Sequence, residues 1–258
     1  MQAYNRAFAR IYNERWIDFA QRVAPRIQAF YESTPVVGEH KTLLDVCCGT
    51  GQLALYFLER GYRVVGIDLS EAMLGYARGN AARYVESGRA RFLQADAADF
   101  CLEERFGLAV STFDSLNHLP DENALRSCFQ SVDAVLVPGG AFIFDLNTRA
   151  GLRRQWSGVQ VQDTEEILLM NRGFYDEETH KAWVKITGFA RTEGGLYERF
   201  EQVAFNTAFN LEWARAALLE SGWCSVHFAH IDDLGTPIAE PESELRAFIV
   251  ALRSPNPP

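Results

Sequence analysis

The spacing of hydrophobic and polar residues differs among three parts of the chain. In residues 1–40, apolar and aromatic side chains recur every three or four positions, which predicts amphipathic helices. In residues 41–150, short apolar runs alternate with stretches of helical length. This alternation is typical of a parallel sheet that helices cover on both faces. In residues 151–207 the period becomes two, which predicts an antiparallel sheet.

The same patterns divide the chain into four predicted parts. Residues 1–40 form an N-terminal helical lid, 41–150 a core, and 151–207 an antiparallel insertion with a hairpin turn at 193–195. Residues 208–258 complete the core sheet with a helix at 210–221, two strands and an acidic loop between them. The expected fold class is therefore α/β.

Composition narrows the class of protein. The chain has 258 residues and a formal charge of −9, with no basic run longer than a pair, so we expect no nucleic-acid partner. No apolar stretch approaches the roughly 18–20 residues that span a bilayer, and the N-terminus does not resemble a signal peptide. Five irregularly spaced cysteines indicate reduced thiols and a cytoplasmic location. We therefore expect a cytoplasmic enzyme without membrane attachment.

A glycine-rich loop, LLDVCCGTGQLA, joins the first predicted strand to the next helix at 43–54. Such a loop lets backbone N–H groups approach a ligand closely. Gly49-x-Gly51-x-x-Ala54, with Asp68 at the end of the second strand, fits a dinucleotide fingerprint and hence an oxidoreductase. This is one of two competing interpretations of the loop.

Asp45 favours the other interpretation. A carboxylate four residues before Gly49 would repel a pyrophosphate on the same loop and attract an ammonium group. S-adenosylmethionine (SAM) carries such a group, and Asp68 could accept hydrogen bonds from its ribose. The sequence thus favours a SAM site, and a SAM-binding protein without catalytic activity remains an alternative.

Five motifs carry a family resemblance. LLDVCCGTG, VVGIDLSEAML, QADAADF, FDSLNHL and LVPGGAFIFDLN occur in this order over 43–147. In this order the chain resembles the class I SAM-dependent methyltransferases, except that Cys47 stands where the family usually has a glycine. The resemblance implies a Rossmann-like, doubly wound sheet of seven mostly parallel strands, the last one antiparallel, with the antiparallel insertion after the fifth strand.

The resemblance also implies SAM as cofactor and S-adenosylhomocysteine (SAH) as product. Asp96 would bind the adenine amino group, or it would only cap the following helix. The complete set of expected cofactor residues is Tyr12, Asp45, Cys47, Gly49, Gly51, Asp68, Leu69, Met73, Asp96, Ala97 and Thr112.

Two segments narrow the resemblance to small-molecule N-methyltransferases related to the amino-sugar N,N-dimethyltransferases. FDSLNHL matches that group and ends near His118, and FARIYNERW matches the group's N-terminal helix. Trp16 replaces an acceptor-side tyrosine, which leaves a stacking or cation–π role. These matches imply a small-molecule acceptor that is methylated on nitrogen rather than oxygen.

His118 is the expected catalytic residue. An unperturbed pKa near 6.5 lets it accept a proton at neutral pH, although a capping or packing role is the alternative. Asn117 and Asp114 would orient the acceptor or cap the next helix. Asp114 and Asp145 could imitate part of a metal site, but the other carboxylates of that pattern are missing, so we expect no metal.

The insertion is rich in aromatic residues. They would form an aromatic lid over the acceptor or a homodimer surface, or only the core of a small sheet. Arg172 and Arg199 in this insertion are expected acceptor contacts.

Overall fold

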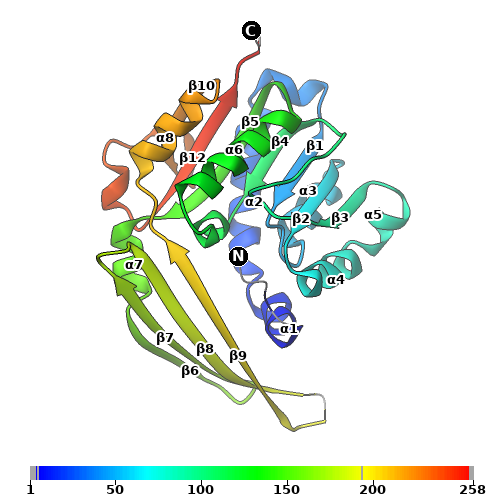
Figure 1. Ribbon diagram of the computed structural model, residues 1–258. Helices are drawn as coiled ribbons and strands as arrows, with labels where there is room; N and C mark the ends of the chain where they lie inside the picture. The colour runs from blue at the N-terminus through cyan, green and yellow to red at the C-terminus, as the bar shows by residue number, and fades with distance from the viewer. Residues whose placement is uncertain (1–3, 5, 193, 256–258) are drawn as a thin grey trace.

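Two β-sheets organise the molecule, for which a computed structural model describes residues 4, 6–192 and 194–255 (Figure 1). The strands of the central sheet are β1 (Thr42–Val46), β2 (Arg63–Asp68), β3 (Ala90–Gln94), β4 (Phe106–Ser111), β5 (Leu136–Asn147), β10 (Trp223–His230), β11 (Asp233–Pro237) and β12 (Arg246–Arg253). Their order in space is β11-β10-β12-β5-β4-β1-β2-β3.

The central sheet confirms the expected α/β fold class and adds one strand. The five strands β1 to β5 are parallel, and β12 runs antiparallel to β5. The eighth strand, β11, lies at the edge beside β10, within the segment expected to be a loop. Its composition, DLGTP, is typical of turns, but an edge strand tolerates a terminal proline because one side of it needs no ladder hydrogen bonds.

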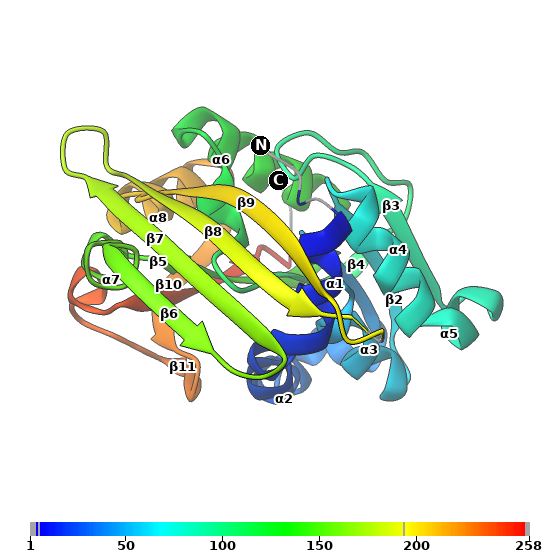
Figure 2. The same cartoon turned by 90° about the horizontal axis from the view of Figure 1, so that it is seen from below.

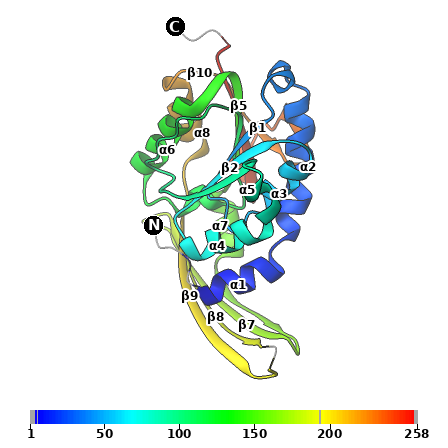
Figure 3. The same cartoon turned by 90° about the vertical axis from the view of Figure 1, so that its right-hand side faces the viewer.

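Helices cover both faces of the central sheet (Figure 3). One face packs against α2 (Asp18–Glu32), α3 (Gln52–Glu59) and α4 (Glu71–Asn80), followed by the short α5 (Ala82–Glu86). The other face packs against α6 (Glu122–Val135) and α8 (Leu211–Glu220). Each face thus buries its own apolar core, as a doubly wound sheet requires.

The N-terminal segment forms two helices that pack on different surfaces. The first, α1 (Arg6–Arg15), ends just before Trp16 and Ile17, and α2 begins at Asp18. Phe8 and Ile11 of α1 pack against the second sheet, whereas α2 packs against the central sheet. Tertiary packing therefore breaks the predicted helical segment. Residues 1–3 and 5, which the prediction also included, lie outside the described residues.

The second sheet is antiparallel and has the order β6-β7-β8-β9. Its strands are β6 (Gly158–Asp163), β7 (Ile167–Asp176), β8 (Lys181–Arg191) and β9 (Tyr197–Thr207), and α7 (Arg149–Gln155) leads into it from β5. Gly195 turns the chain between β8 and β9 with a φ of 74°, and Glu193 of the predicted turn lies outside the described residues. Figure 2 shows this sheet spread beneath the core, with α1 between it and α4.

All five cysteines are free. Within the described residues, no helix is long and apolar enough to cross a membrane.

Candidate active site

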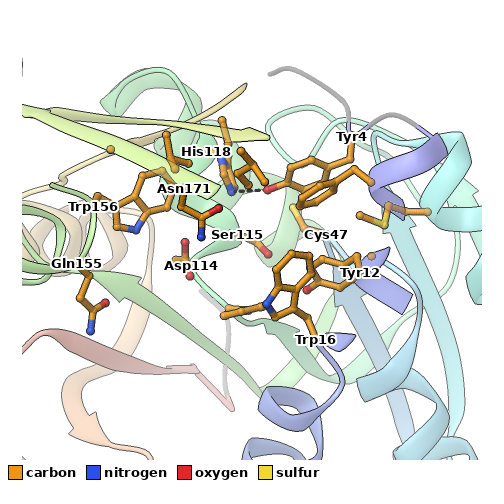
Figure 4. Close-up of a pocket in the computed structure, with 18 of the residues that line it drawn as sticks. Tyr4, Tyr12, Trp16, Cys47, Asp114, Ser115, His118, Gln155, Trp156 and Asn171 are labelled. Atoms are coloured by element: carbon orange, nitrogen blue, oxygen red, sulfur yellow. Dashed lines mark hydrogen bonds between the residues drawn. The ribbon is translucent and has the colours of Figure 1, made fainter. Parts of the chain in front are cut away.

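A cavity of about 330 Å³ lies between the carboxyl ends of the central strands and the inner face of the second sheet. Figure 4 shows aromatic side chains from the N-terminal segment on one side of it, and Trp156 and Asn171 on the other. Open α/β sheets bind ligands at this end of their strands. The predicted site residues in its wall are Tyr12, Trp16, Cys47, Gly49, Asp68, Leu69, Met73, Ala97, Asp114 and His118.

The glycine-rich loop turns sharply between β1 and α3. Cys47, Gly49 and Gly51 all have positive φ angles, of 60°, 54° and 77°. This left-handed conformation favours glycine, which gives the physical reason for the glycine that the resemblance places at Cys47. A Cβ at Gly49 would lie 3.7 Å from the ring of Tyr12, so this aromatic side chain lies over the loop.

Gly51 has a different environment. It is not in the cavity wall, and a Cβ there would lie 3.0 Å from Cβ and 3.2 Å from Cα of Ala77 in α4. The close approach of α3 and α4 therefore accounts for this glycine. Gly51 would influence a bound cofactor through the shape of the loop, and not by touching it.

Asp68 lies at the end of β2 and faces the cavity. Its Oδ2 accepts from the backbone N–H of Gly49 at 2.9 Å, and its Oδ1 accepts from Ser70 N at 2.8 Å. Burial raises the pKa of this carboxyl, and the backbone donors of Ser70, Gly49 and Leu69 oppose that shift. Each carboxylate oxygen has a second lone pair, so Asp68 can accept further hydrogen bonds from a ligand.

Asp45 is 2% exposed, and its Oδ2 has no hydrogen-bond partner. Burial, reinforced by the nearby carboxyl of Asp68, raises the pKa of Asp45 to about 8. The side chain borders a small second cavity of about 30 Å³ together with Thr112 and with Thr50, whose buried Oγ1 also has no partner. Tyr12, Trp16 and Cys47 line both cavities.

Four of the predicted cofactor residues, Leu69, Met73, Ala97 and Asp96, do not all lie in the cavity wall. Leu69, Met73 and Ala97 line the main cavity. Asp96 is not in its wall; its Oδ1 accepts from Ala98 N at 2.9 Å and so closes a local turn. It caps no helix, because the segment that follows is not helical.

His118 ends the 3₁₀ turn Ser115–His118 after β4 and lies in the cavity wall. Its Nδ1 is 2.6 Å from the carbonyl oxygen of Phe205 in β9. A carbonyl can only accept, so Nδ1 carries the proton and Nε2 presents a lone pair. Burial lowers the pKa of His118, while the carboxylate of Asp114 opposes the shift. The neutral ring is thus the favoured form, and it can accept a proton.

Tyr4 contacts that lone pair. The phenol oxygen is 3.1 Å from His118 Nε2, as the dashed line in Figure 4 shows. The ring of Tyr4 stacks on Phe8, with 4.7 Å between the ring centroids. The backbone carbonyl of Tyr4 accepts from Ser70 Oγ at 2.8 Å, which ties the N-terminal segment to the start of α4.

A guanidinium lies between two acidic side chains at the cavity floor. Arg246 of β12 donates to Asp114 at 2.7 Å and also to the fully buried Asp145. Asp145 in turn accepts the backbone N–H groups of Phe113 and Asp114. The two carboxylates are therefore committed to a cation that the chain itself supplies. Within the described residues, no group of three or more metal-binding side chains occurs.

Asn117 is held by backbone groups at the ends of two strands. It is fully buried and does not line the cavity. Its amide donates to the carbonyls of Asn147 and Thr207 and accepts from Asn147 N. It thereby joins β5 to β9, and the following helix is capped by Asp121 instead.

Arg172 and Arg199 do not reach the cavity. Both are exposed on the outer face of the second sheet, where Arg172 contacts Thr187 and Arg199 pairs with Glu201. Successive residues of a strand point to opposite faces, and the inner face of β7 presents Asn171 instead. The prediction that these two arginines contact an acceptor therefore has no support in this arrangement.

The cavity residues that were not singled out from the sequence include Tyr4, Phe113 and Arg246. Two acidic residues at neighbouring strand ends, Asp114 and Asp145, were a signal that a cation must lie nearby. No comparable signal marked Tyr4.

Part of the chain matches a known type of domain. Residues 43–140 match the model of a methyltransferase domain. YqeM, a candidate methyltransferase of Bacillus subtilis, is 28% identical over 84% of this chain and 85% of its own. The dTDP-3-amino-3,4,6-trideoxy-alpha-D-glucopyranose N,N-dimethyltransferase of Streptomyces venezuelae is 31% identical over 52% of this chain and 53% of its own.

Solved structures of similar proteins share the fold. A SAM-dependent methyltransferase from Clostridium acetobutylicum superposes with a TM-score of 0.78 at 20% identity, over 96% of this chain and 98% of that one. The sugar N-methyltransferase KedS8 from Streptoalloteichus gives a TM-score of 0.74 at 23% identity, over 98% and 95%. The domain match and the relatives show a methyltransferase domain over residues 43–140, and the solved structures show the fold of SAM-dependent methyltransferases, in agreement with the motifs.

Proposed function

We propose that this methyltransferase transfers the methyl group of SAM to a nitrogen atom of a small molecule held in the 330 Å³ cavity. The observation that carries the proposal is the neutral His118 in the cavity wall, whose Nε2 can take up a proton. An amine must lose a proton to become methylated, so a proton acceptor at this place suits a nitrogen acceptor. The likeness to sugar N-methyltransferases supports the same conclusion.

The residues around the glycine-rich loop fit SAM. Asp45 Oδ2 and Thr50 Oγ1 are buried polar atoms without partners beside a small cavity, and an ammonium group and a carboxylate at that place would satisfy both. Asp68 would accept from the ribose, and Leu69 and Met73 would contact the adenine ring. When bound, SAM supplies a methyl group on a sulfonium that is already a good leaving group.

The chain's own task is then to orient and enclose the acceptor. Tyr12 and Trp16, with Phe113 and Trp156, give the cavity aromatic walls that exclude water. The formal charge of −9 favours a cationic or neutral acceptor over a polyanion. Holding two reactants in line can lower a barrier by several kcal/mol (roughly 7–11 in well-oriented model reactions).

Methyl transfer from radiolabelled SAM to a panel of amines, amino sugars included, tests this proposal. Each amine is paired with the hydroxyl analogue of the same skeleton. We expect label on nitrogen, and a His118→Ala variant should lose about 100-fold in kcat with an unchanged affinity for SAH. Transfer to hydroxyl analogues only would contradict the nitrogen specificity. Binding of SAH without transfer to any small molecule would contradict the proposed enzyme activity.

The second sheet supports a homodimer as the second part of the proposal. Its outer face exposes a set of large apolar side chains: Val159, Val161, Phe174, Trp183, Phe189 and Val203. Phe174, Trp183 and Phe205 are cross-strand partners in one row. The charged residues Lys185, Arg199 and Glu201, which carry both signs, lie on the same face. The face can therefore pair with a second copy of itself, as a two-fold interface requires. An apolar face of this kind usually marks an interaction site.

Light scattering after size-exclusion chromatography tests the dimer. We expect a dimer for the natural chain and monomers for Phe174→Glu and Trp183→Glu. Leu219→Glu, which adds the same charge at an exposed apolar residue of α8, should remain dimeric. A monomeric natural chain at every concentration would contradict this part of the proposal, whereas the methyl-transfer proposal would stand.

A further inference from the structure

The hydrogen bonds of His118 leave it no free atom with which to accept a proton from an acceptor. Nδ1 donates to the carbonyl of Phe205 at 2.6 Å, and Nε2 is 3.1 Å from the hydroxyl of Tyr4. A neutral imidazole has one lone pair in the ring plane, and here that lone pair accepts from Tyr4. The atom that faces the acceptor is therefore the phenol oxygen of Tyr4.

Contacts of its ring and its backbone hold Tyr4 in the position that contact with the acceptor requires. Its side chain lines the cavity (Figure 4). The Tyr4 ring is fixed by stacking on Phe8, and its backbone carbonyl is fixed by Ser70, two residues after Asp68. After donating its proton to His118, the hydroxyl keeps two lone pairs with which it can accept from an amine N–H.

We propose that Tyr4 is a catalytic residue that takes the proton of the acceptor nitrogen and passes its own proton to His118. This inference rests on the proposed N-methyl transfer. As the acceptor nitrogen bonds to the methyl carbon, the bond between that carbon and sulfur breaks, and its electron pair stays on sulfur. The surplus proton of the nitrogen moves to Tyr4 Oη while the Tyr4 proton moves to His118 Nε2. Tyr4 is thus restored, and the imidazolium releases its proton to water when the product leaves.

The electrostatic surroundings favour this relay over direct proton removal by a phenolate. Burial, with the carboxylates of Asp114 and Asp68, raises the pKa of Tyr4 above its ordinary value, so the hydroxyl stays protonated. Asp114 also faces His118 and stabilises the imidazolium that the relay forms. From β9, His118 is faced by the Phe205 carbonyl and the Asn206 amide, both uncharged.

Tyr4→Phe removes the hydroxyl and keeps the ring that stacks on Phe8. We expect kcat to fall by about 100-fold, with the KM for SAM unchanged. The matched control is Tyr56→Phe, which removes the hydroxyl that bonds to Gln28 on the surface of α3, and it should keep the natural kcat. Unchanged kcat in Tyr4→Phe, together with a loss in His118→Ala, would overturn the role of Tyr4 and leave the proposed function intact.

Two further readouts separate a relay from a purely structural contact. In a double-mutant cycle, the double variant Tyr4→Phe/His118→Ala should lose no more kcat than His118→Ala alone, because both substitutions remove the same proton path. The acid limb of the kcat–pH profile should move to higher pH in Tyr4→Phe, since the hydroxyl donates only to the unprotonated ring. Additive losses with an unmoved acid limb would overturn the relay. If the natural protein transfers no methyl group to any amine, the proposed function itself fails.

Discussion

Arg246 of β12 donates from Nη2 to Asp114 Oδ1 over 2.7 Å, and its other amino group contacts Asp145 in β5. Asp145 also accepts the backbone N–H groups of Phe113 and Asp114, at 2.7 and 2.9 Å. Phe113 and Asp114 have φ angles of 66° and 49°, a backbone region that residues other than glycine rarely adopt. One buried ion-pair cluster therefore holds the strained floor of the cavity.

Replacing Arg246 by Met should destabilise the protein by about 3–5 kcal/mol, because it leaves buried carboxylates without their cation. Urea unfolding followed by circular dichroism measures the loss. The double variant Arg246→Met/Asp145→Asn should recover part of it, since the uncompensated charge at Asp145 is then removed. Arg126→Ala, which breaks a surface pair with Glu220, is the control and should change stability little. A loss as small as that of the control would show that the cluster does not stabilise the fold.

Asp45 makes the stability of the ligand-free protein depend on pH. Its pKa is about 8 in the folded state, against an ordinary value of 3.8, so the folded chain binds a proton that the unfolded chain releases. Between these two values the protonated native form loses its advantage as pH rises, and stability falls. In Asp45→Asn this dependence is absent. The Tm advantage of the variant should grow from about pH 4 and level off above about pH 8; a constant difference across that range would contradict the assignment.

The same carboxyl couples cofactor binding to proton release. If an ammonium group binds to ionised Asp45, binding at pH 7 expels the proton that the empty site holds. Calorimetric titration with SAH in buffers of different ionisation enthalpy should show this release, and Asp45→Asn should abolish it and weaken binding. Equal proton release by the natural chain and the variant would assign the proton to another group.

The parallel core and the positions of Asp45 and Asp68 at the strand ends were largely predictable from the sequence. Apolar runs of strand length fix which segments are buried on both faces, and strand ends such as Asp45 and Asp68 then lie at one edge of the sheet. The break at Trp16 and Ile17 was not predictable, because neither residue is a helix breaker. It arises because α1 and α2 pack on different sheets. The edge strand β11 was missed because its composition is that of a turn.

The opposite wall of the cavity was less predictable, since it depends on which face of each strand points inward and on contacts between distant segments. Tyr4 and His118 are 114 positions apart, and no local pattern joins them. Arg172 and Asn171 are neighbours in sequence, yet a strand turns one outward and the other into the cavity. The role of each residue in the insertion therefore required the register of the second sheet.

Two glycines of the loop should separate packing from ligand contact. Alanine at either one adopts a left-handed conformation at a cost of about 1–2 kcal/mol. At Gly51 the new methyl group also presses on the backbone of Ala77, so Gly51→Ala should lower Tm more than Gly49→Ala. At Gly49 it protrudes beneath Tyr12, where it should weaken SAH binding more than Gly51→Ala does. Thermal unfolding and calorimetry measure both, and the reverse ranking in either would contradict this division.

Asn117 should matter for folding rather than for acceptor binding. Asn117→Ala leaves two backbone groups of Asn147 and the carbonyl of Thr207 without their partner. Each buried polar group left unsatisfied costs about 1–3 kcal/mol, so urea unfolding should show a loss of at least about 2 kcal/mol. Asn171→Ala is the control, because Oδ1 of that amide already lacks a partner, and it should cost less. If Asn117→Ala keeps its stability but raises the KM for the acceptor, Asn117 orients the acceptor after all, by a rearrangement that frees its amide from β5 and β9.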